Sequence, residues 1–303
     1  MLGDFVALCT HVDVATDAVD QRVVAPYDPR PGPRSGCTDS VLLTVRIVAE
    51  LVGLDAATRC LASRRRTHPD LVPLLPERSR DNRRRRHLAE PTKRMRGAIM
   101  ARRWRVLEAE GADRCAIDRV PVPAVGFPHA RHAQRWDGAA ADGRVAAKQQ
   151  TIDGCTLPLL VSASGLSRAF ALVAANAADG TLAEPRLIDQ AGLTVLGDQG
   201  SLTGPLQQRL AWRNEWTVLT PKRRNQRDQL PAALTRAINQ ARQIIETVNS
   251  QLVGQCNLQR NRAKSVWGLA ARVQAKLAAH TRGLYLKYGA GRPLLALMDL
   301  ALI

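Results

Sequence analysis

The stretch Leu193-Thr-Val-Leu-Gly-Asp198-Gln-Gly200 combines a short apolar run with a carboxylate at its end. No charged residue interrupts the run before Asp198, and a glycine follows two positions later. Short apolar runs bounded by turn residues are typical of buried strands in sheets that are covered on both faces. In such sheets, ligands and reacting groups lie at the strand ends. Asp198 is therefore a candidate reacting group, although an Asp that only begins the turn after a strand would give the same pattern.

Two further acidic residues have comparable settings. Asp118 lies in a second short apolar strand, Cys115–Val120. Glu246 lies in a segment, Leu234–Leu252, whose apolar residues recur every three or four positions, which predicts an amphipathic helix. Glu246 follows Ile245 on the shoulder of the apolar stripe, so its carboxylate can face the sheet edge. Two strand-end Asp residues and a helix-borne Glu form an oxygen-only set that suits Mg²⁺ or Mn²⁺. Two such ions can clamp the attacking and leaving oxygens of a phosphoryl transfer.

The composition favours a nucleic-acid partner. The chain has 303 residues, enough for one large and one smaller domain, and a formal net charge of +17. Such a charge indicates a polyanionic partner, most simply double-stranded DNA. Arg greatly outnumbers Lys, which suits bidentate phosphate binding, although a GC-rich coding sequence would give the same bias. The six cysteines form no C-x-x-C pair, so neither a disulfide framework nor a zinc site is indicated. Without a signal peptide or a membrane-spanning apolar run, we expect a cytoplasmic protein that does not associate with membranes.

Two basic regions are candidate DNA contacts. Thr38–Ser40 can cap a helix over Val41–Leu51, a second helix is expected at about 56–63, and Ser79 can cap a third that holds an arginine run. Three short helices with basic faces resemble a helix–turn–helix module, whereas the other interpretation of the arginine run is a solvated surface. A basic loop that leads to the Glu246 helix is the second region. The candidate DNA-binding residues are Arg83, Arg84, Arg85, Arg86, Lys148, Lys222, Arg223, Arg224 and Arg242.

The remaining pattern predicts an α/β protein. Pro121-Val-Pro123 begins a polar loop, and two apolar segments around Ser164-Gly165 predict a β-hairpin. Further predicted elements are a helix within 1–20, helices over Thr181–Gln190, Gly204–Arg213 and 263–286, and a strand over Trp216–Leu219. This order, with acids on the first strand, a later strand and a late helix, is that of an RNase H-like mixed sheet flanked by helices. The expected parts are an N-terminal helix and Pro-rich linker (1–36), a helical DNA-binding region (37–112), the catalytic domain (113–290) and a tail (291–303).

Five segments occur in an order that is found in a known family. They are Cys37-Thr-Asp-Ser40, Ala147-Lys-Gln-Gln-Thr151, Leu219-Thr-Pro-Lys-Arg-Arg-Asn-Gln226, Ile245-Glu-Thr-Val-Asn-Ser-Gln-Leu252 and Asn261-Arg-Ala-Lys-Ser-Val-Trp-Gly268. With them the chain resembles the DDE transposases of bacterial insertion sequences, specifically insertion-sequence family 982, from about Cys37 to Leu286. The resemblance implies an RNase H-like catalytic domain in which Asp118, Asp198 and Glu246 are the catalytic, metal-binding acids. It also implies action on the DNA ends of the element, with a homodimer as the expected form on DNA.

The sequence departs from the family pattern at three positions. After the second Asp, such enzymes commonly have a Lys and then an aromatic residue, where this chain has Gln199 and Ser201. Related transposases carry a Lys seven residues past the catalytic Glu, where this chain has Val253. We therefore expect a transposase that cuts and joins DNA, and two alternatives stay open. These are another RNase H-like nuclease and a decayed, inactive copy that acts at most as a basic DNA-binding protein.

Overall fold

The computed structural model describes residues 5–24, 36–53, 66, 76–107, 113–125, 136, 140–145, 150–177, 191–197, 204–221, 229–260 and 262–297. The chain divides into two compact units, one formed by Met1–Arg105 with Gln251–Ile303 and the other by Val106–Ser250. The predicted helices at 56–63 and 181–190, most of the linker, and Asp198 lie outside the described residues. The predicted domain boundaries stay predictions.

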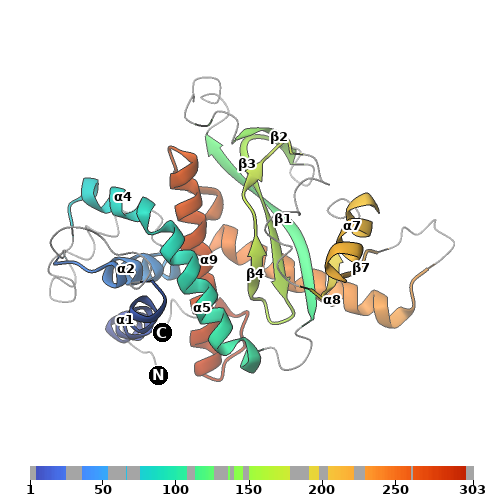
Figure 1. The fold of residues 1–303 in the computed structure, drawn as a ribbon, viewed down its shortest axis with the longest axis horizontal. Coiled ribbons are helices and arrows are strands. Elements are labelled where there is room, and N and C mark those ends of the chain that lie inside the picture. Colours follow the sequence, from blue (N-terminus) through green and yellow to red (C-terminus); the bar gives the residue numbers. More distant parts are fainter. Residues whose placement is uncertain are drawn as a thin grey trace. The chain divides into compact units, whose positions relative to one another are not determined.

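The unit Val106–Ser250 is built on a mixed sheet of seven described strands (Figure 1). Five of them lie in the order β2-β3-β1-β6-β7, while β4 and β5 pair with β3. β1 is antiparallel to β3 and parallel to β6, which in turn is parallel to β7. The strands are β1 (Arg114–Val125), β2 (Ala141–Val145), β3 (Gln150–Ser162), β4 (Ser167–Phe170), β5 (Val173–Ala174), β6 (Thr194–Gly197) and β7 (Thr217–Leu219). With helices α7 (Gly204–Asn214) and α8 (Ala232–Gly254), this architecture confirms the predicted RNase H-like α/β fold.

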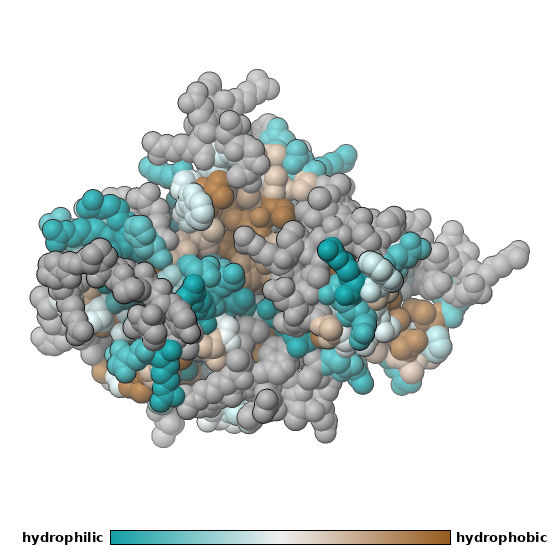
Figure 2. All heavy atoms as spheres, viewed as in Figure 1, coloured by the Kyte–Doolittle hydropathy of each residue, from teal (hydrophilic) through white to brown (hydrophobic). Residues whose placement is uncertain are grey.

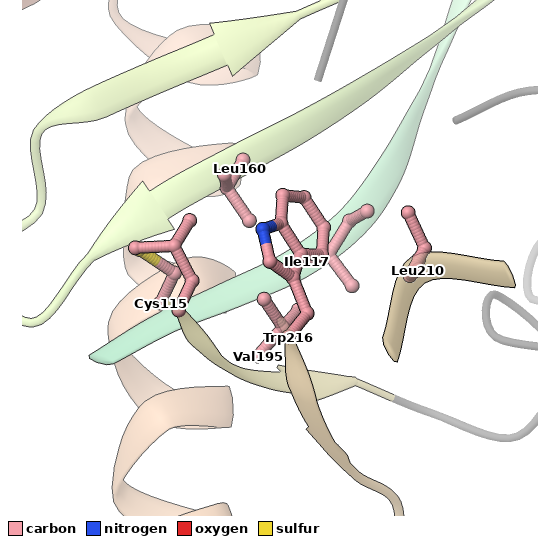
Figure 3. Close-up of a cluster of buried hydrophobic side chains, with 7 residues drawn as sticks. Cys115, Ile117, Leu160, Val195, Leu210 and Trp216 are labelled. Carbon is pink, nitrogen blue, oxygen red and sulfur yellow. The ribbon is translucent and has the colours of Figure 1, made fainter. Parts of the chain in front are cut away.

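The two faces of the sheet are both covered by helices, as the apolar run of β6 predicts. Val195 and its neighbour Leu196 point to opposite faces and are both buried. On one face, Val195 packs in a cluster to which α7 contributes Leu210 (Figure 3). The cluster consists of Cys115, Ile117, Leu160, Leu193, Val195, Leu210 and Trp216. On the other face, α8 approaches β1 closely enough for a side-chain hydrogen bond between Asn249 and Asp118. Helix α8 thus brings its polar side chains to the end of the β1–β6 pairing.

Two sequence predictions in this unit were wrong for non-local reasons. β1 continues through Pro121 and Pro123 to Val125, although prolines cannot donate to a ladder. Both prolines lie opposite β3, at Thr156 and Gly154, and beyond the last described pair of β1 with β6, Ile117 and Gly197. The segment Ala141–Val145, expected to be a loop, is strand β2, which pairs with β3. Gly143 permits this strand, since a Cβ there would lie 2.5 Å from the Ala175 side chain.

The described regular secondary structure of the other unit is all helical. It contains α1 (Phe5–Val19), the π-helix η1 (Asp20–Val24), α2 (Asp39–Leu51), α4 (Arg78–His87), α5 (Ala89–Leu107), the 3₁₀ helix η7 (Leu258–Arg260) and α9 (Val266–Gly289). α2 packs against both α1 and α9. As predicted, Thr38 caps α2 by accepting a hydrogen bond from the backbone N–H of Val41 at 3.3 Å. The predicted cap at Ser79 was wrong, because α4 already begins at Arg78.

Lys276 and His280 are two of the buried polar side chains of α9 in this helical unit. The Lys276 Nζ donates to Glu50 Oε2 at 2.6 Å and also to the Cys256 carbonyl oxygen. The fully buried His280 lies with Nε2 2.9 Å from Gln251 Oε1, while the Gln251 amide N–H donates to the Leu295 carbonyl. Because that Gln251 oxygen can only accept, the His280 Nε2 must carry a proton. Burial lowers the pKa of His280 from 6.5 to about 4.

Stability should fall as the pH is lowered because of this histidine. Between pH 6.5 and 4, His280 is protonated in the unfolded chain but not in the folded chain. Proton binding therefore favours the unfolded chain in this range, and the contribution of neutral His280 to the free energy of unfolding is complete only above pH 6.5. It should decrease by about 2 kcal/mol between pH 7 and pH 5. Urea unfolding of the wild type and of His280→Gln at both pH values measures this, with His11→Gln, at an exposed position, as the control. An equal pH dependence in wild type and His280→Gln would contradict the prediction.

Candidate active site

A small hollow of about 50 Å³ gathers residues from β1, β6 and α8. Its lining consists of Ile117, Asp118, Leu196, Gly197, Arg242, Ile245 and Glu246. The parallel register pairs Ile117 of β1 with Gly197 of β6, and Asp118 directly follows this last described pair. Asp198 follows Gly197 directly in the sequence and lies outside the described residues. The hollow therefore lies where β1, which carries Asp118, runs beside the last described residues of β6.

Asp118 is half-buried and is held by a neighbour from α8. The Asn249 Nδ2 donates a hydrogen bond of 2.7 Å to Oδ2 of Asp118. Sequence reasoning missed Asn249. The only signal was its position three residues after Glu246, which places both on one side of a helix.

Glu246 lines the same hollow as Asp118, although the two are far apart in the sequence. Its Oε1 lies 3.7 Å from a guanidinium nitrogen of Arg242, one helical turn earlier, and both side chains are largely exposed. An exposed i,i+4 pair contributes only a few tenths of a kcal/mol to stability. The buried stripe Ile238, Ile245, Val248 and Leu252 fixes the rotation of α8 and so brings Arg242 and Glu246 to this edge.

The oxygen atoms at this edge fit a hard divalent cation. Asp118 and Glu246 supply carboxylates, and the buried Oδ1 of Asn249 has no hydrogen-bond partner among the described residues. Mg²⁺ and Mn²⁺ prefer such oxygen donors. Asp198 lies outside the described residues. Among the described residues, no group of three or more His, Cys, Asp or Glu side chains could hold a metal ion.

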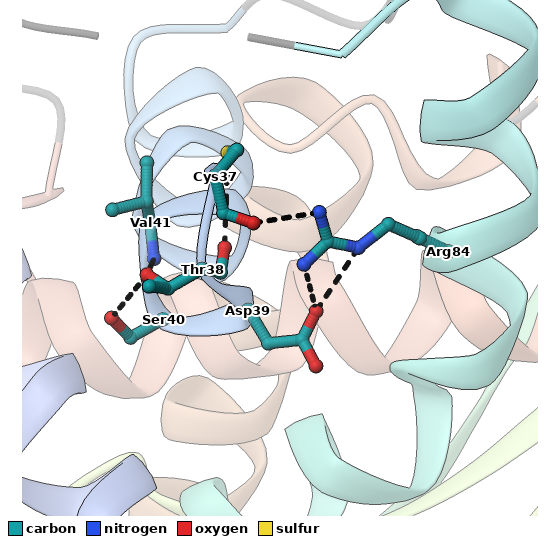
Figure 4. Close-up of polar contacts among 6 residues, drawn as sticks. All are labelled: Cys37, Thr38, Asp39, Ser40, Val41 and Arg84. Atoms are coloured by element: carbon teal, nitrogen blue, oxygen red, sulfur yellow. Dashed lines mark hydrogen bonds and ion pairs between the residues drawn. The ribbon is translucent and has the colours of Figure 1, made fainter. Parts of the chain in front are cut away.

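The predicted DNA-binding residues differ in their exposure and in their contacts. Arg84 of α4 donates to the Cys37 carbonyl oxygen at 2.7 Å and forms an ion pair with Asp39 at the first turn of α2 (Figure 4). This contact ties α4 to α2. Arg83 is exposed on α4, over which hydrophilic residues gather (Figure 2). Arg242 lines the hollow. The side chains of Arg85, Arg86, Lys148, Lys222, Arg223 and Arg224 lie outside the described residues.

The mixed sheet, with Asp118 on its central strand β1, places the chain in the RNase H-like class of α/β proteins. The particular family follows from comparison with known proteins: the sequence model for the transposase DDE domain matches residues 110–282. This match covers more than half of the chain, so the chain belongs to the transposase DDE domain family. The family supports a transposase function in general terms, with DNA as partner and divalent metal ions in general use.

Two other comparisons gave no match. Neither a curated protein nor a solved structure matches the chain. Among the helices that the structure describes, none is long and apolar enough to cross a membrane.

Proposed function

We propose that the chain is an insertion-sequence transposase that cuts DNA at the ends of its own element and transfers the freed 3′ ends to target DNA. The observation that carries this proposal is the hollow shared by Asp118, Glu246 and Gly197, the residue before Asp198. The resemblance of the five sequence segments supports insertion-sequence family 982 as the subgroup. An element has two ends, and both must be held for transfer to one target site, which favours a homodimer on DNA.

In this proposal Asp118, Asp198 and Glu246 hold two Mg²⁺ or Mn²⁺ ions. Bound there, the ions supply activation of water and stabilisation of the attacking and leaving oxygens. Asn249 keeps the Asp118 carboxylate in place, and Arg242 offsets the negative charge of Glu246. Arg242 can also bind a DNA phosphate, because its planar guanidinium matches phosphate oxygens. No protein nucleophile is required, since each step is an in-line displacement at phosphorus.

The experiment is a strand-transfer assay with the full chain. The DNA carries the inverted repeats that flank the reading frame, and a supercoiled plasmid serves as the target. We expect new 3′-OH ends at the repeats and joined products, both only with Mg²⁺ or Mn²⁺. Cutting without joining would instead indicate another RNase H-like nuclease. Metal-independent DNA binding without cutting would indicate a decayed copy, in line with Gln199, Ser201 and Val253.

DNA binding should depend on the arginine run of α4. We expect that changing Arg83, Arg85 and Arg86 to Gln weakens binding and lowers the slope of log K against log salt by about 0.9 for each phosphate that the variant no longer neutralises. Arg84 is retained because it holds α4 to α2. Fluorescence anisotropy with labelled DNA at several salt concentrations measures the slope.

A charge-matched control separates direct phosphate binding from the effect of net charge. The exposed residues Arg22, Arg236 and Arg292, on three separate segments, are changed to Gln together. Both variants lose three positive charges, but only the α4 variant takes them from one run of the sequence. If the two slopes decrease equally, the arginine run is a solvated surface.

A further inference from the structure

Asn249 is a polar residue of α8 that is not one of the three proposed metal-binding acids. It lies on α8, three residues after Glu246, between the buried Val248 and the exposed Ser250. Asn is a poor helix former, because its side chain competes for backbone hydrogen bonds. Its amide instead reaches β1 and donates to Asp118 Oδ2 at 2.7 Å. This charge-assisted bond fixes one oxygen of a carboxylate that lines the hollow.

The same hydrogen bond also fixes the other half of the amide. The ionised Asp118 carboxylate only accepts, so Nδ2 must face it and Oδ1 must point elsewhere. Oδ1 of Asn249 is buried and has no hydrogen-bond partner among the described residues. A buried carbonyl oxygen in that state costs roughly 1–3 kcal/mol. A ligand that donates a hydrogen bond to this oxygen would remove the cost.

We propose that Asn249 is a positioning residue of the acidic site, an inference that rests on the proposed function. Its N–H holds the Asp118 carboxylate, and its Oδ1 accepts a hydrogen bond from a water molecule of the hydrated divalent cation. Mg²⁺ and Mn²⁺ sites keep several such waters, which need acceptors beyond the carboxylates. Arg242, Glu246 and Asn249 then form one side of α8 that faces the cation and its DNA substrate, at spacings of four and three.

The test is direct Mn²⁺ binding to the DNA-free protein, followed by the electron paramagnetic resonance signal of free Mn²⁺. Asn249→Leu keeps the branched shape of the side chain but removes both polar atoms. We expect Mn²⁺ affinity to fall roughly 10–100-fold, as is usual when a residue that orients a metal ligand is removed. Thermal stability should stay equal or rise, because the unpartnered buried carbonyl disappears. Asn239→Leu, at an exposed position of the same helix, is the matched control and should bind Mn²⁺ like the wild type.

Asp118→Asn separates this inference from the proposed function. If Asp118→Asn abolishes Mn²⁺ binding while Asn249→Leu binds with wild-type affinity, Asn249 only ties α8 to β1 and the inference is wrong. If Asp118→Asn itself binds normally, the acidic site and the inference both fail. Should Asn249→Leu not fold, Asn249→Ala, with its higher helix propensity, gives the same comparison.

Discussion

Asp118→Asn and Glu246→Gln should each reduce cleavage of element ends by more than about 100-fold, since even the removal of an outer-shell partner of a metal costs 10–100-fold. Each substitution keeps the shape of the side chain and removes one negative charge from the hollow. DNA affinity should persist or increase, because one repulsive charge facing the phosphates is gone. Gel-based cleavage assays, with anisotropy for DNA binding, measure the two effects separately.

The control is Glu90→Gln on α5, where the acid is largely exposed and pairs only loosely with Lys93 and Arg94. It removes the same charge outside the hollow and should cleave like the wild type. Wild-type cleavage by either Asp118→Asn or Glu246→Gln would remove that carboxylate from the catalytic site. Loss of DNA binding together with cleavage would indicate unfolding rather than chemistry, which circular dichroism would detect.

The parts of the fold that local pattern decides could be predicted from the sequence. The apolar run before Asp198 predicts β6, and the three- and four-residue spacing around Ile245 predicts α8; both are present. The same spacing places Glu246 at the edge of the buried stripe, and the structure brings it to the hollow with Asp118. These features depend on the spacing of apolar residues along the chain, which can be read from a single sequence.

Features that depend on contacts between distant segments could not be predicted in the same way. β2 pairs with β3, and the prolines of β1 lie in a strand that pairs with β3, which their own sequence does not indicate. The arginine run of α4 is uniform in sequence, and the position of Arg84 opposite Asp39 depends on how α4 and α2 pack. The hydrogen bond of Asn249 to Asp118 likewise joins residues of α8 and β1 that are far apart in the sequence.

The stability of the helical unit should depend strongly on the buried ion pair between Glu50 and Lys276. Glu50→Ala should lower the free energy of unfolding by about 3–5 kcal/mol, because it leaves Lys276 charged and buried without its partner. The Lys276 side chain is only 2% exposed, so water cannot replace the missing carboxylate. The Cys256 carbonyl oxygen still accepts one of its hydrogen bonds but carries no full charge.

A double variant distinguishes the ion pair from simple loss of packing. Glu50→Ala with Lys276→Met removes the stranded charge and keeps an unbranched chain in its place. It should recover most of the stability, because a buried ion pair replaced by apolar groups is often neutral. Chemical denaturation of the wild type, of Glu50→Ala and Lys276→Met alone, and of the double variant gives the coupling free energy. If the double variant is as unstable as Glu50→Ala, the cost comes from the cavity left by Glu50, and the charge of Lys276 is tolerated by the helices around it.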